Sequence, residues 1–226
     1  TSNENVAAVT LYTVQQGRSL TLTAAQADGE VIEGAGAVTV TALATTPDAD
    51  LSHLAGGLTV TANLVSTGGV SLSADLSTVD NLNITGSGTV TVQEGATLNG
   101  SLEIAVGTGS TLSLTAADAA QVEAITRTGT GKVTVTALHS TLDADLAHIA
   151  APITILLSAD ATLTAGAAIG AVNLTVDKTG DGPYTLDVTA LGADLGLTSA
   201  ESLTVKAGTT LELTAAQADG KTITAE

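Results

Sequence analysis

The chain has 226 residues, and its 6 Lys and Arg residues stand against 23 Asp and Glu residues, which gives a formal net charge of −17. Nucleic acids and anionic membranes are bound by clustered basic side chains, so this charge argues against both as partners. The absence of Cys excludes disulfides and thiolate metal sites. With no Phe or Trp and only two Tyr, the chain also lacks the large aromatic volumes of an ordinary enzyme core. No apolar run reaches the roughly 18 residues needed to span a bilayer, so we expect no transmembrane segment.

Residues 1–16 form a lead segment with one apolar strand candidate, VAAVTLYTV at 6–14, after the polar stretch TSNEN. They match none of the repeats that follow. We consider two roles for this N-terminal lead strand: an assembly arm that covers the open end of the next subunit, or a cap on its own solenoid. The chain opens at Thr1 without a visible signal peptide, which leaves open a removed leader, an artificial start or a fragment.

Two phrases recur in the rest of the chain. GRSLTLTAAQADG at 17–29 returns as GSTLSLTAADAAQ at 109–121 and as GTTLELTAAQADG at 208–220; the phrase at 38–60 returns at 133–155 with 14 of 23 positions identical. Repeated sequence indicates repeated structural units that stack into an elongated body. We divide the chain into repeat 1 (17–108), repeat 2 (109–207) and a partial repeat 3 (208–226), and we expect 17–226 to form one continuous solenoid.

Alternating aliphatic and hydroxyl residues predict short strands along the whole chain, because a period of two places aliphatic side chains on one face and Thr or Ser on the other. Thr and Val are β-branched and suit a pleated surface, and Gly and Asn/Asp clusters separate the runs. The expected strands cover 20–23, 38–43, 58–64, 82–85, 89–92, 98–106, 112–115, 133–138, 153–157, 162–164, 172–176, 185–191, 203–205, 211–214 and 222–224.

The connections between these strands suggest the fold. Asp residues before Leu-x-x-Leu or Leu-x-x-Ile steps predict short helical turns at 48–57 and 143–151, and each TAAQADG segment predicts a corner or a single turn. Strands often recur about every 20 residues, which fits one coil of a β-solenoid. We therefore predict an all-β fold, a parallel β-solenoid (β-helix) with irregular coils and short helical corners. The alternative is a tandem β-sandwich that divides near residue 108.

No group of residues forms a recognisable catalytic site, and we predict that the chain is not an enzyme and needs no cofactor. His53 and His148 occupy the same repeat position, which favours a structural role, and we place His139 in a surface loop. Carboxylates in turns are typical Ca²⁺ ligands, but no EF-hand or calcium β-roll spacing is present. We therefore favour solvated turns over a Ca²⁺ site at Asp48, Asp50, Asp143, Asp145, Asp177 and Asp181.

The Thr-x-Thr rows suggest a separate hypothesis, because a flat ladder of hydroxyl and methyl groups resembles the ice-contacting face of β-solenoid antifreeze proteins. Such a face needs one coil length that repeats faithfully, so that the ladder stays in register. The steps vary here, and Ser113, Asp187 and Glu212 interrupt the rows. We therefore favour ordinary solvent-facing strand residues.

In its style of Thr- and Gly-rich repeats, the chain resembles the repeat regions of large secreted bacterial surface proteins, namely adhesins, surface-layer subunits and filament proteins. The resemblance implies an extracellular or cell-surface structural role. Together with the repeats, it predicts a subunit that self-assembles head to tail into a filament, tube or surface lattice, with itself as partner. The alternative is an adhesin or an ice- or glycan-binding module that uses the Thr-rich strand face. A carbohydrate-active enzyme would rest on fold analogy alone.

The third copy of the first phrase stops at Glu226, just after its second strand. We expect the last coil to expose unpaired backbone groups, which strand addition from another copy would satisfy. The residues that we assign to this contact are Val6, Val9, Leu11, Val14, Leu211, Leu213 and Ile223.

Overall fold

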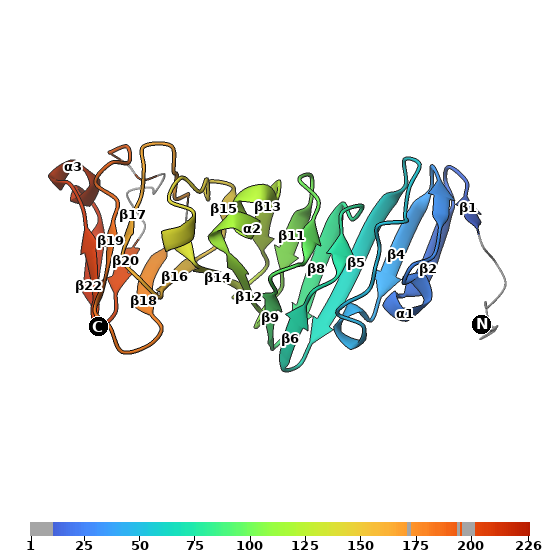
Figure 1. The fold of residues 1–226 in the computed structure, drawn as a ribbon, viewed down its shortest axis with the longest axis horizontal. Helices are drawn as coiled ribbons and strands as arrows, with labels where there is room; N and C mark the ends of the chain where they lie inside the picture. Colours follow the sequence, from blue (N-terminus) through green and yellow to red (C-terminus); the bar gives the residue numbers. More distant parts are fainter. Residues whose placement is uncertain (1–10, 171–172, 194, 196–201) are drawn as a thin grey trace.

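The computed structural model describes residues 11–170, 173–193, 195 and 202–226. They form an elongated solenoid, with β1 (Tyr12–Val14) and β2 (Ser19–Thr23) at one end and α3 (Ala215–Ala218) and β22 (Thr222–Ala225) at the other (Figure 1). Every strand pairing in the described part of the chain is parallel. The predicted parallel β-solenoid is therefore confirmed.

Two large sheets form the body of the solenoid. One has seven strands in the order β15-β13-β11-β8-β5-β4-β2, and the other has eight in the order β22-β20-β18-β16-β14-β12-β9-β6. The further strands of the first sheet are β4 (Ala37–Thr41), β5 (Thr59–Ser66), β8 (Asn81–Gly86), β11 (Glu103–Val106), β13 (Ala124–Arg127) and β15 (Ile149–Ala150). Those of the second are β6 (Gly69–Leu72), β9 (Thr89–Val92), β12 (Thr111–Thr115), β14 (Lys132–Thr136), β16 (Ile153–Leu157), β18 (Leu174–Lys178) and β20 (Ser202–Val205).

Smaller sheets and short helical corners close the coils. β1 pairs with β3, β10 pairs with β7, and β17, β19 and β21 form a three-stranded sheet. The bounds of these elements are β3 (Ile32–Gly34), β7 (Asp75–Leu76), β10 (Thr97–Leu98), β17 (Ala161–Thr162), β19 (Tyr184–Asp187), β21 (Thr209–Glu212), α1 (Ala24–Ala27), α2 (Ala116–Gln121), η1 (Leu43–Thr45) and η2 (Leu138–Ser140).

One coil takes about 20 residues, as the sequence predicts. Paired residues are 18 positions apart at Leu20 and Val38 and 29 apart at Leu174 and Leu203, and the other pairings fall between 20 and 25. The alternative of a tandem β-sandwich that divides near residue 108 is wrong, because both large parallel sheets continue without a break across this position.

The three copies of the first phrase lie on three different sheets. β2 of the first copy belongs to the seven-stranded sheet, β12 of the second to the eight-stranded sheet and β21 of the third to the three-stranded sheet. Each recurrence spans four coils plus one further face of the solenoid. The spacing of 92 and then 99 residues between copies is therefore not a whole number of coils, which is why the sequence repeat looks irregular.

The turns predicted at 48–57 and 143–151 are present as single hydrogen-bonded turns, but neither segment forms a helix. The Leu54 N–H donates to the Leu51 carbonyl at 3.3 Å, and the Ile149 N–H donates to the Leu146 carbonyl at 3.2 Å. In both copies a 3₁₀ helix lies earlier, at η1 and η2, and each is entered through an alanine with a positive φ, such as Ala42 at 57°. The segment after η1 instead runs beside the next coil, where the Leu51 N–H donates to the Asp75 carbonyl at 3.1 Å. The local capping interaction is still formed, because the Asp50 carboxylate accepts the Ser52 N–H at 3.0 Å, and backbone pairing between coils limits the segment to this one turn.

The corners predicted from TAAQADG are confirmed as single helical turns, α1 and α3. In α1 the Thr23 N–H donates to Gln26 Oε1 at 3.0 Å, and in α3 the Thr214 N–H donates to Gln217 Oε1 at 2.8 Å. This is the reciprocal capping box that Thr-x-x-Gln predicts.

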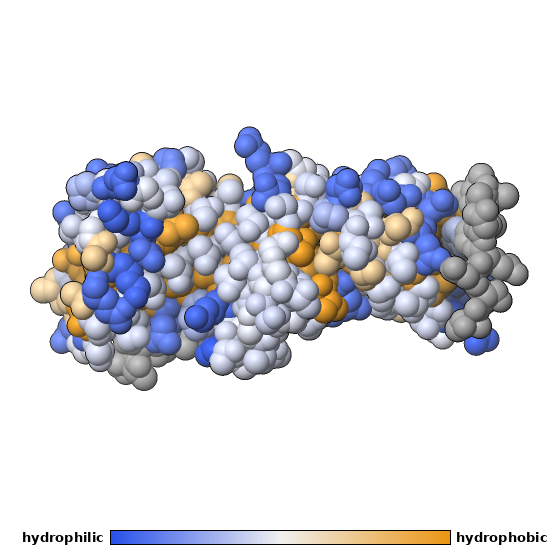
Figure 2. All heavy atoms as spheres, turned by 90° about the horizontal axis from the view of Figure 1, so that it is seen from below, coloured by the Kyte–Doolittle hydropathy of each residue, from blue (hydrophilic) through white to orange (hydrophobic). Residues whose placement is uncertain are grey.

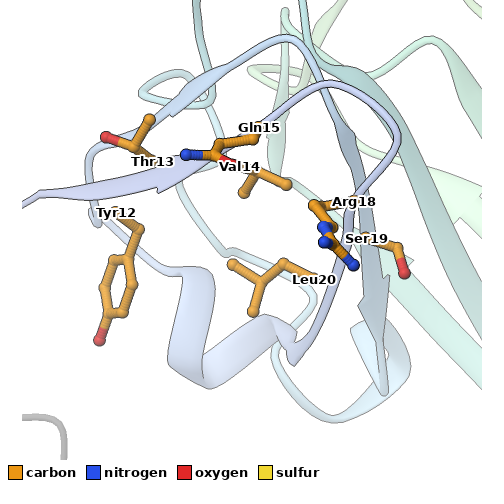
Figure 3. A pocket seen from close by; sticks show the side chains of 7 residues that line it. All are labelled: Tyr12, Thr13, Val14, Gln15, Arg18, Ser19 and Leu20. Carbon is orange, nitrogen blue, oxygen red and sulfur yellow. The ribbon is translucent and has the colours of Figure 1, made fainter.

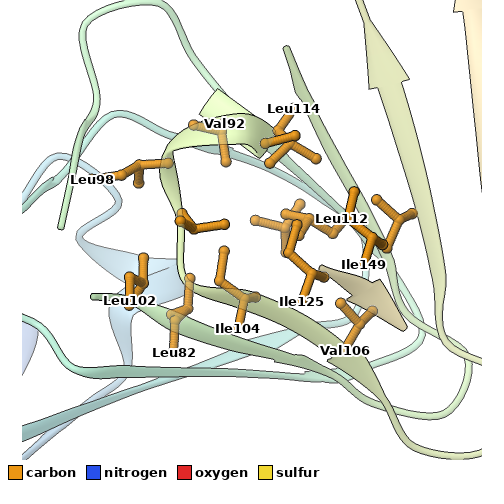
Figure 4. Packing of buried hydrophobic residues seen from close by; sticks show 14 of the residues in the cluster. Leu82, Val92, Leu98, Leu102, Ile104, Val106, Leu112, Leu114, Ile125 and Ile149 are labelled. Atoms are coloured by element: carbon orange, nitrogen blue, oxygen red, sulfur yellow. The ribbon is translucent and has the colours of Figure 1, made fainter. Parts of the chain in front are cut away.

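Aliphatic columns fill the interior, with one member from each coil. Figure 4 shows Leu82, Ile104 and Leu112 converging on the space between the two large sheets. Because each column follows the strand register, a substitution at one position changes the packing of the coils on either side. One column consists of Leu22, Val40, Ala62, Leu82, Ile104, Ile125 and Ile149. The other consists of Val70, Val90, Leu112, Val133, Ile153, Leu174, Leu203 and Ile223.

The outer surface is mostly of intermediate hydropathy in the view of Figure 2, with hydrophobic residues in a broken band along the long axis. Among the described residues, no helix has the length and apolarity to cross a bilayer.

Candidate functional site: the end coils and a hydroxyl ladder

The first coil consists of β1, β2 and α1, and β2 is the outermost described strand of the seven-stranded sheet. Its inward side chains Tyr12 and Leu20 are half-buried, whereas their partners in the next coil, Ile32 and Val38, are fully buried. Tyr12, Leu20 and Arg18 line part of a depression of about 320 Å³ at this end (Figure 3). The aliphatic interior is thus only partly covered at the first coil.

The last coil consists of β21, α3 and β22, and β22 is the outermost described strand of the eight-stranded sheet. Ile223 ends the aliphatic column of that sheet and is 49% exposed, whereas its partner Leu203 is fully buried. Leu211 and Leu213 on the neighbouring face are half-buried. Ile32, which holds the place of Ile223 in repeat 1, is fully buried under the next coil.

The two end coils are built from copies of one sequence. Residues 17–29 and 208–220 are identical at 10 of 13 positions. Both begin at a glycine with a left-handed φ, 73° at Gly17 and 77° at Gly208, and both continue as a strand, a helical turn and a further strand. The cross-section of the solenoid is therefore built alike at its two ends.

Although residues 1–16 match none of the repeated phrases, β1 has a place in the fold equivalent to that of β20. Val14 and Val205 both lie three residues before the glycine that opens the phrase, and β1 precedes β2 as β20 precedes β21. The sequence similarity is too short to notice, because only the inward residues of this strand are constrained by packing.

The seven residues predicted to form the assembly contact do not all lie on exposed surfaces of the end coils. Val6 and Val9 lie outside the described residues. Leu11 is 49% exposed, but Val14 is buried, and β1 pairs with β3 of the same chain. At 12–14 the lead segment therefore belongs to its own solenoid, and Val14 is not available to a second copy. The other three residues lie together on the last coil, namely Leu211, Leu213 and Ile223.

A column of hydroxyl side chains crosses all eight strands of the larger sheet. Strand register pairs each member with the next, and none of the eight is buried. Neighbouring strands are about 4.7–4.9 Å apart, so the hydroxyl groups repeat at that interval along the solenoid. The members are Ser71, Thr91, Ser113, Thr134, Thr154, Thr175, Thr204 and Thr224.

The expectation that varying coil lengths break the register of this ladder is therefore wrong. The differences in length are absorbed in the corners, even where paired residues are 29 positions apart. Flanking columns are less regular, because Lys132, Leu156 and Asp177 replace hydroxyl residues there. The ladder that stays in register is one residue wide, and Ser71 and Ser113 take the place of Thr in it.

The titratable groups of the described chain mainly stabilise turns. The Asp50 carboxylate accepts hydrogen bonds from the Ser52 hydroxyl at 2.6 Å and the Ser52 N–H at 3.0 Å, which lowers the pKa of Asp50. Likewise, the N–H and hydroxyl of Thr189 lower the pKa of Asp187. An ion pair with Glu226 raises the pKa of Lys206.

The histidines and paired carboxylates do not converge on one site. His148 Nε2 lies 2.7 Å from the Ala119 carbonyl of a neighbouring coil, and His53 lies beside Asp50. Over residues 11–170, 173–193, 195 and 202–226, no group of three His, Cys, Asp or Glu residues could hold a metal ion. The Asp145 carboxylate accepts the Ala147 N–H at 2.9 Å, which is a turn contact of the kind that the sequence analysis favoured.

Sequence reasoning missed Gln26 and Gln217. Gln217 is fully buried, and its amide donates to carbonyls of the coil beneath it, whereas Gln26 at the equivalent position is exposed. The repeated TAAQADG phrase contained the signal, because a glutamine in both copies indicates the same local geometry.

Comparisons with known proteins do not assign the chain to a family. A scan against protein-family models, a search of curated proteins and a search of solved structures each found no match.

Proposed function

We propose that this chain is a structural subunit of an extracellular or cell-surface assembly, in which copies stack end to end into a filament, tube or lattice. The observation that carries the proposal is the partial exposure of the aliphatic columns at both end coils, which are built from copies of one phrase that are identical at 10 of 13 positions. Burying apolar surface contributes about 25 cal/mol per Å². Another coil placed on either end would bury apolar surface and gain this free energy, as each coil within the solenoid does.

Open strand edges supply the second contribution. β2 and β22 each pair on one side only among the described residues. Parallel addition of a strand would satisfy their free N–H and C=O groups along the whole edge. Such stacking joins the first coil of one copy to the last coil of another, which is a heterologous contact and gives open-ended assemblies.

The register of this contact follows from the equivalence of β1 with β20 and of β2 with β21. Within the chain Leu203 pairs with Ile223, and Leu186 pairs with Leu211. If the first coil of a second copy repeats this arrangement, its Tyr12 lies over Ile223 and its Leu20 lies over Leu211. Aliphatic and aromatic side chains then continue the column.

Replacing Ile223 by Glu is expected to weaken end-to-end association at least about ten-fold, which corresponds to 1.4 kcal/mol. The new carboxylate would have to lose its water in the contact. The matched control is Val65→Glu, because Val65 is 57% exposed on the side of the solenoid. Sedimentation velocity over a concentration series measures both variants. Equal association of the two variants, or a monomeric parent protein at every concentration, would contradict the proposal.

The hydroxyl ladder favours a second candidate function, a binding module for ice or a glycan. Eight in-register hydroxyl groups with their regular spacing offer a repeating set of hydrogen-bond partners to a repeating ligand. The ladder is long but narrow, so we place this function after the structural one.

Lysine at Thr134 and Thr154, two adjacent ladder positions, is expected to abolish any thermal hysteresis or glycan-array binding of the monomer. The bulky charged side chains would interrupt the ladder at its middle. The control has lysine at Thr39 and Thr61, which are adjacent on the other large sheet. A parent monomer without either activity, or identical results for the two variants, would rule out the binding module.

A further inference from the structure

Gln217 shows how this phrase attaches a coil to the one beneath it. The side chain is fully buried, and Nε2 donates to the Val188 carbonyl at 2.8 Å and to the Leu191 carbonyl at 3.1 Å. Its Oε1 accepts the Thr214 N–H within the same corner. One amide group thus closes its own helical turn with its oxygen and binds the underlying coil with its nitrogen.

Gln26 has the same corner but no coil beneath it among the described residues. Its Oε1 accepts the Thr23 N–H at 3.0 Å, as in the last coil. Its side chain is exposed, and no hydrogen bond joins its Nε2 to the described part of the chain. The capping box holds the amide in the orientation that Gln217 uses.

We propose that Gln26 is a specificity residue of the end-to-end contact, where its Nε2 donates to main-chain carbonyls of a second copy of this chain. The inference rests on the proposed stacking function. In that arrangement Gln26 faces residues 213–217 of the second copy. β19 and β21 are paired, with Asp187 opposite Glu212. Residues 213–217, which follow β21, therefore correspond to residues 188–192, which follow β19. The carbonyls of 213–217 would therefore take the place of the acceptors of Gln217.

Gln26→Glu separates the two roles of this side chain. A Glu carboxylate still accepts the Thr23 N–H, so the corner and the fold are retained. It has no N–H to donate, and it would repel the partner's carbonyl groups. Gln217→Glu makes the same change where the contact is intramolecular, and Gln93→Glu adds the same charge at a partly exposed position in a middle coil.

The experiment measures association by sedimentation velocity and melting temperature by circular dichroism, on the 226-residue chain and the three variants. We expect Gln26→Glu to weaken association at least about ten-fold at an unchanged melting temperature. Gln93→Glu should change neither quantity, and Gln217→Glu should lower the melting temperature. Undiminished association of Gln26→Glu, with the parent protein associating, overturns the role of Gln26 but leaves the stacking function. A monomeric parent protein overturns both.

Discussion

Leu112→Ala is expected to lower the free energy of unfolding by about 2–5 kcal/mol, the range for deleting a buried Leu side chain. Leu112 is fully buried on β12, in the middle of an eight-membered column, between Val90 and Val133. The coils on either side are fixed by backbone pairing and cannot collapse into the space, so the cavity stays open.

Equilibrium unfolding in urea measures this loss. Ser113→Ala is the matched control, because Ser113 is the next residue on the same strand and points outward. It should change the stability by less than about 0.5 kcal/mol, as surface substitutions usually do. A loss below about 1 kcal/mol for Leu112→Ala would contradict a tightly packed interior.

Gly86→Ala is expected to destabilise the protein by about 2 kcal/mol or more. Gly86 has a φ of 106°, a conformation that side chains disfavour. A Cβ atom there would lie 1.9 Å from the Ser66 carbonyl oxygen of the previous coil. Both coils would have to shift, since the obstacle is backbone.

Gly69→Ala tests whether this effect depends on position. A Cβ atom at Gly69 meets no heavy atom within 4 Å, and Gly69 lies only one coil away from the corner. Thermal unfolding should give a clearly lower midpoint for Gly86→Ala and a near-parental midpoint for Gly69→Ala. Similar midpoints for both variants would show that the corner is not as tightly stacked as the structure has it.

Much of the architecture could be predicted from the sequence, because the alternation of aliphatic and hydroxyl residues determines which side of a strand faces inward. Val133 to Val135, for example, is enough to define the inward face of β14. The corners of TAAQADG were predictable for the same reason, since Thr23 and Gln26 are a local capping pair.

The features that sequence reasoning missed depend on contacts between coils. At 48–57 only one hydrogen-bonded turn forms rather than a helix, and the Leu51 N–H pairs with the Asp75 carbonyl, which is 24 residues away. The hydroxyl ladder stays in register because backbone pairing aligns Thr175 with Thr204 whatever the corner between them contains. The local periodicity of the sequence does not predict which distant residues pair in this way.

The end coils could be predicted only in outline. Ile223, which the sequence analysis assigns to the end-to-end contact, is 49% exposed on the last described coil. Val14 was assigned to the intermolecular contact, but it is buried within its own chain, since three residues of β1 are enough to pair with β3. The role that we propose for Gln26 could not be predicted from the sequence, because it is inferred from the hydrogen bond of Gln217 to the neighbouring coil.

Negative-stain electron microscopy of the purified chain over a range of concentrations tests end-to-end stacking most directly. Stacking predicts rods of constant width whose lengths are multiples of one solenoid and increase with concentration. Single bodies of one length at every concentration, or rafts of solenoids joined side by side without end-to-end contacts, would contradict it.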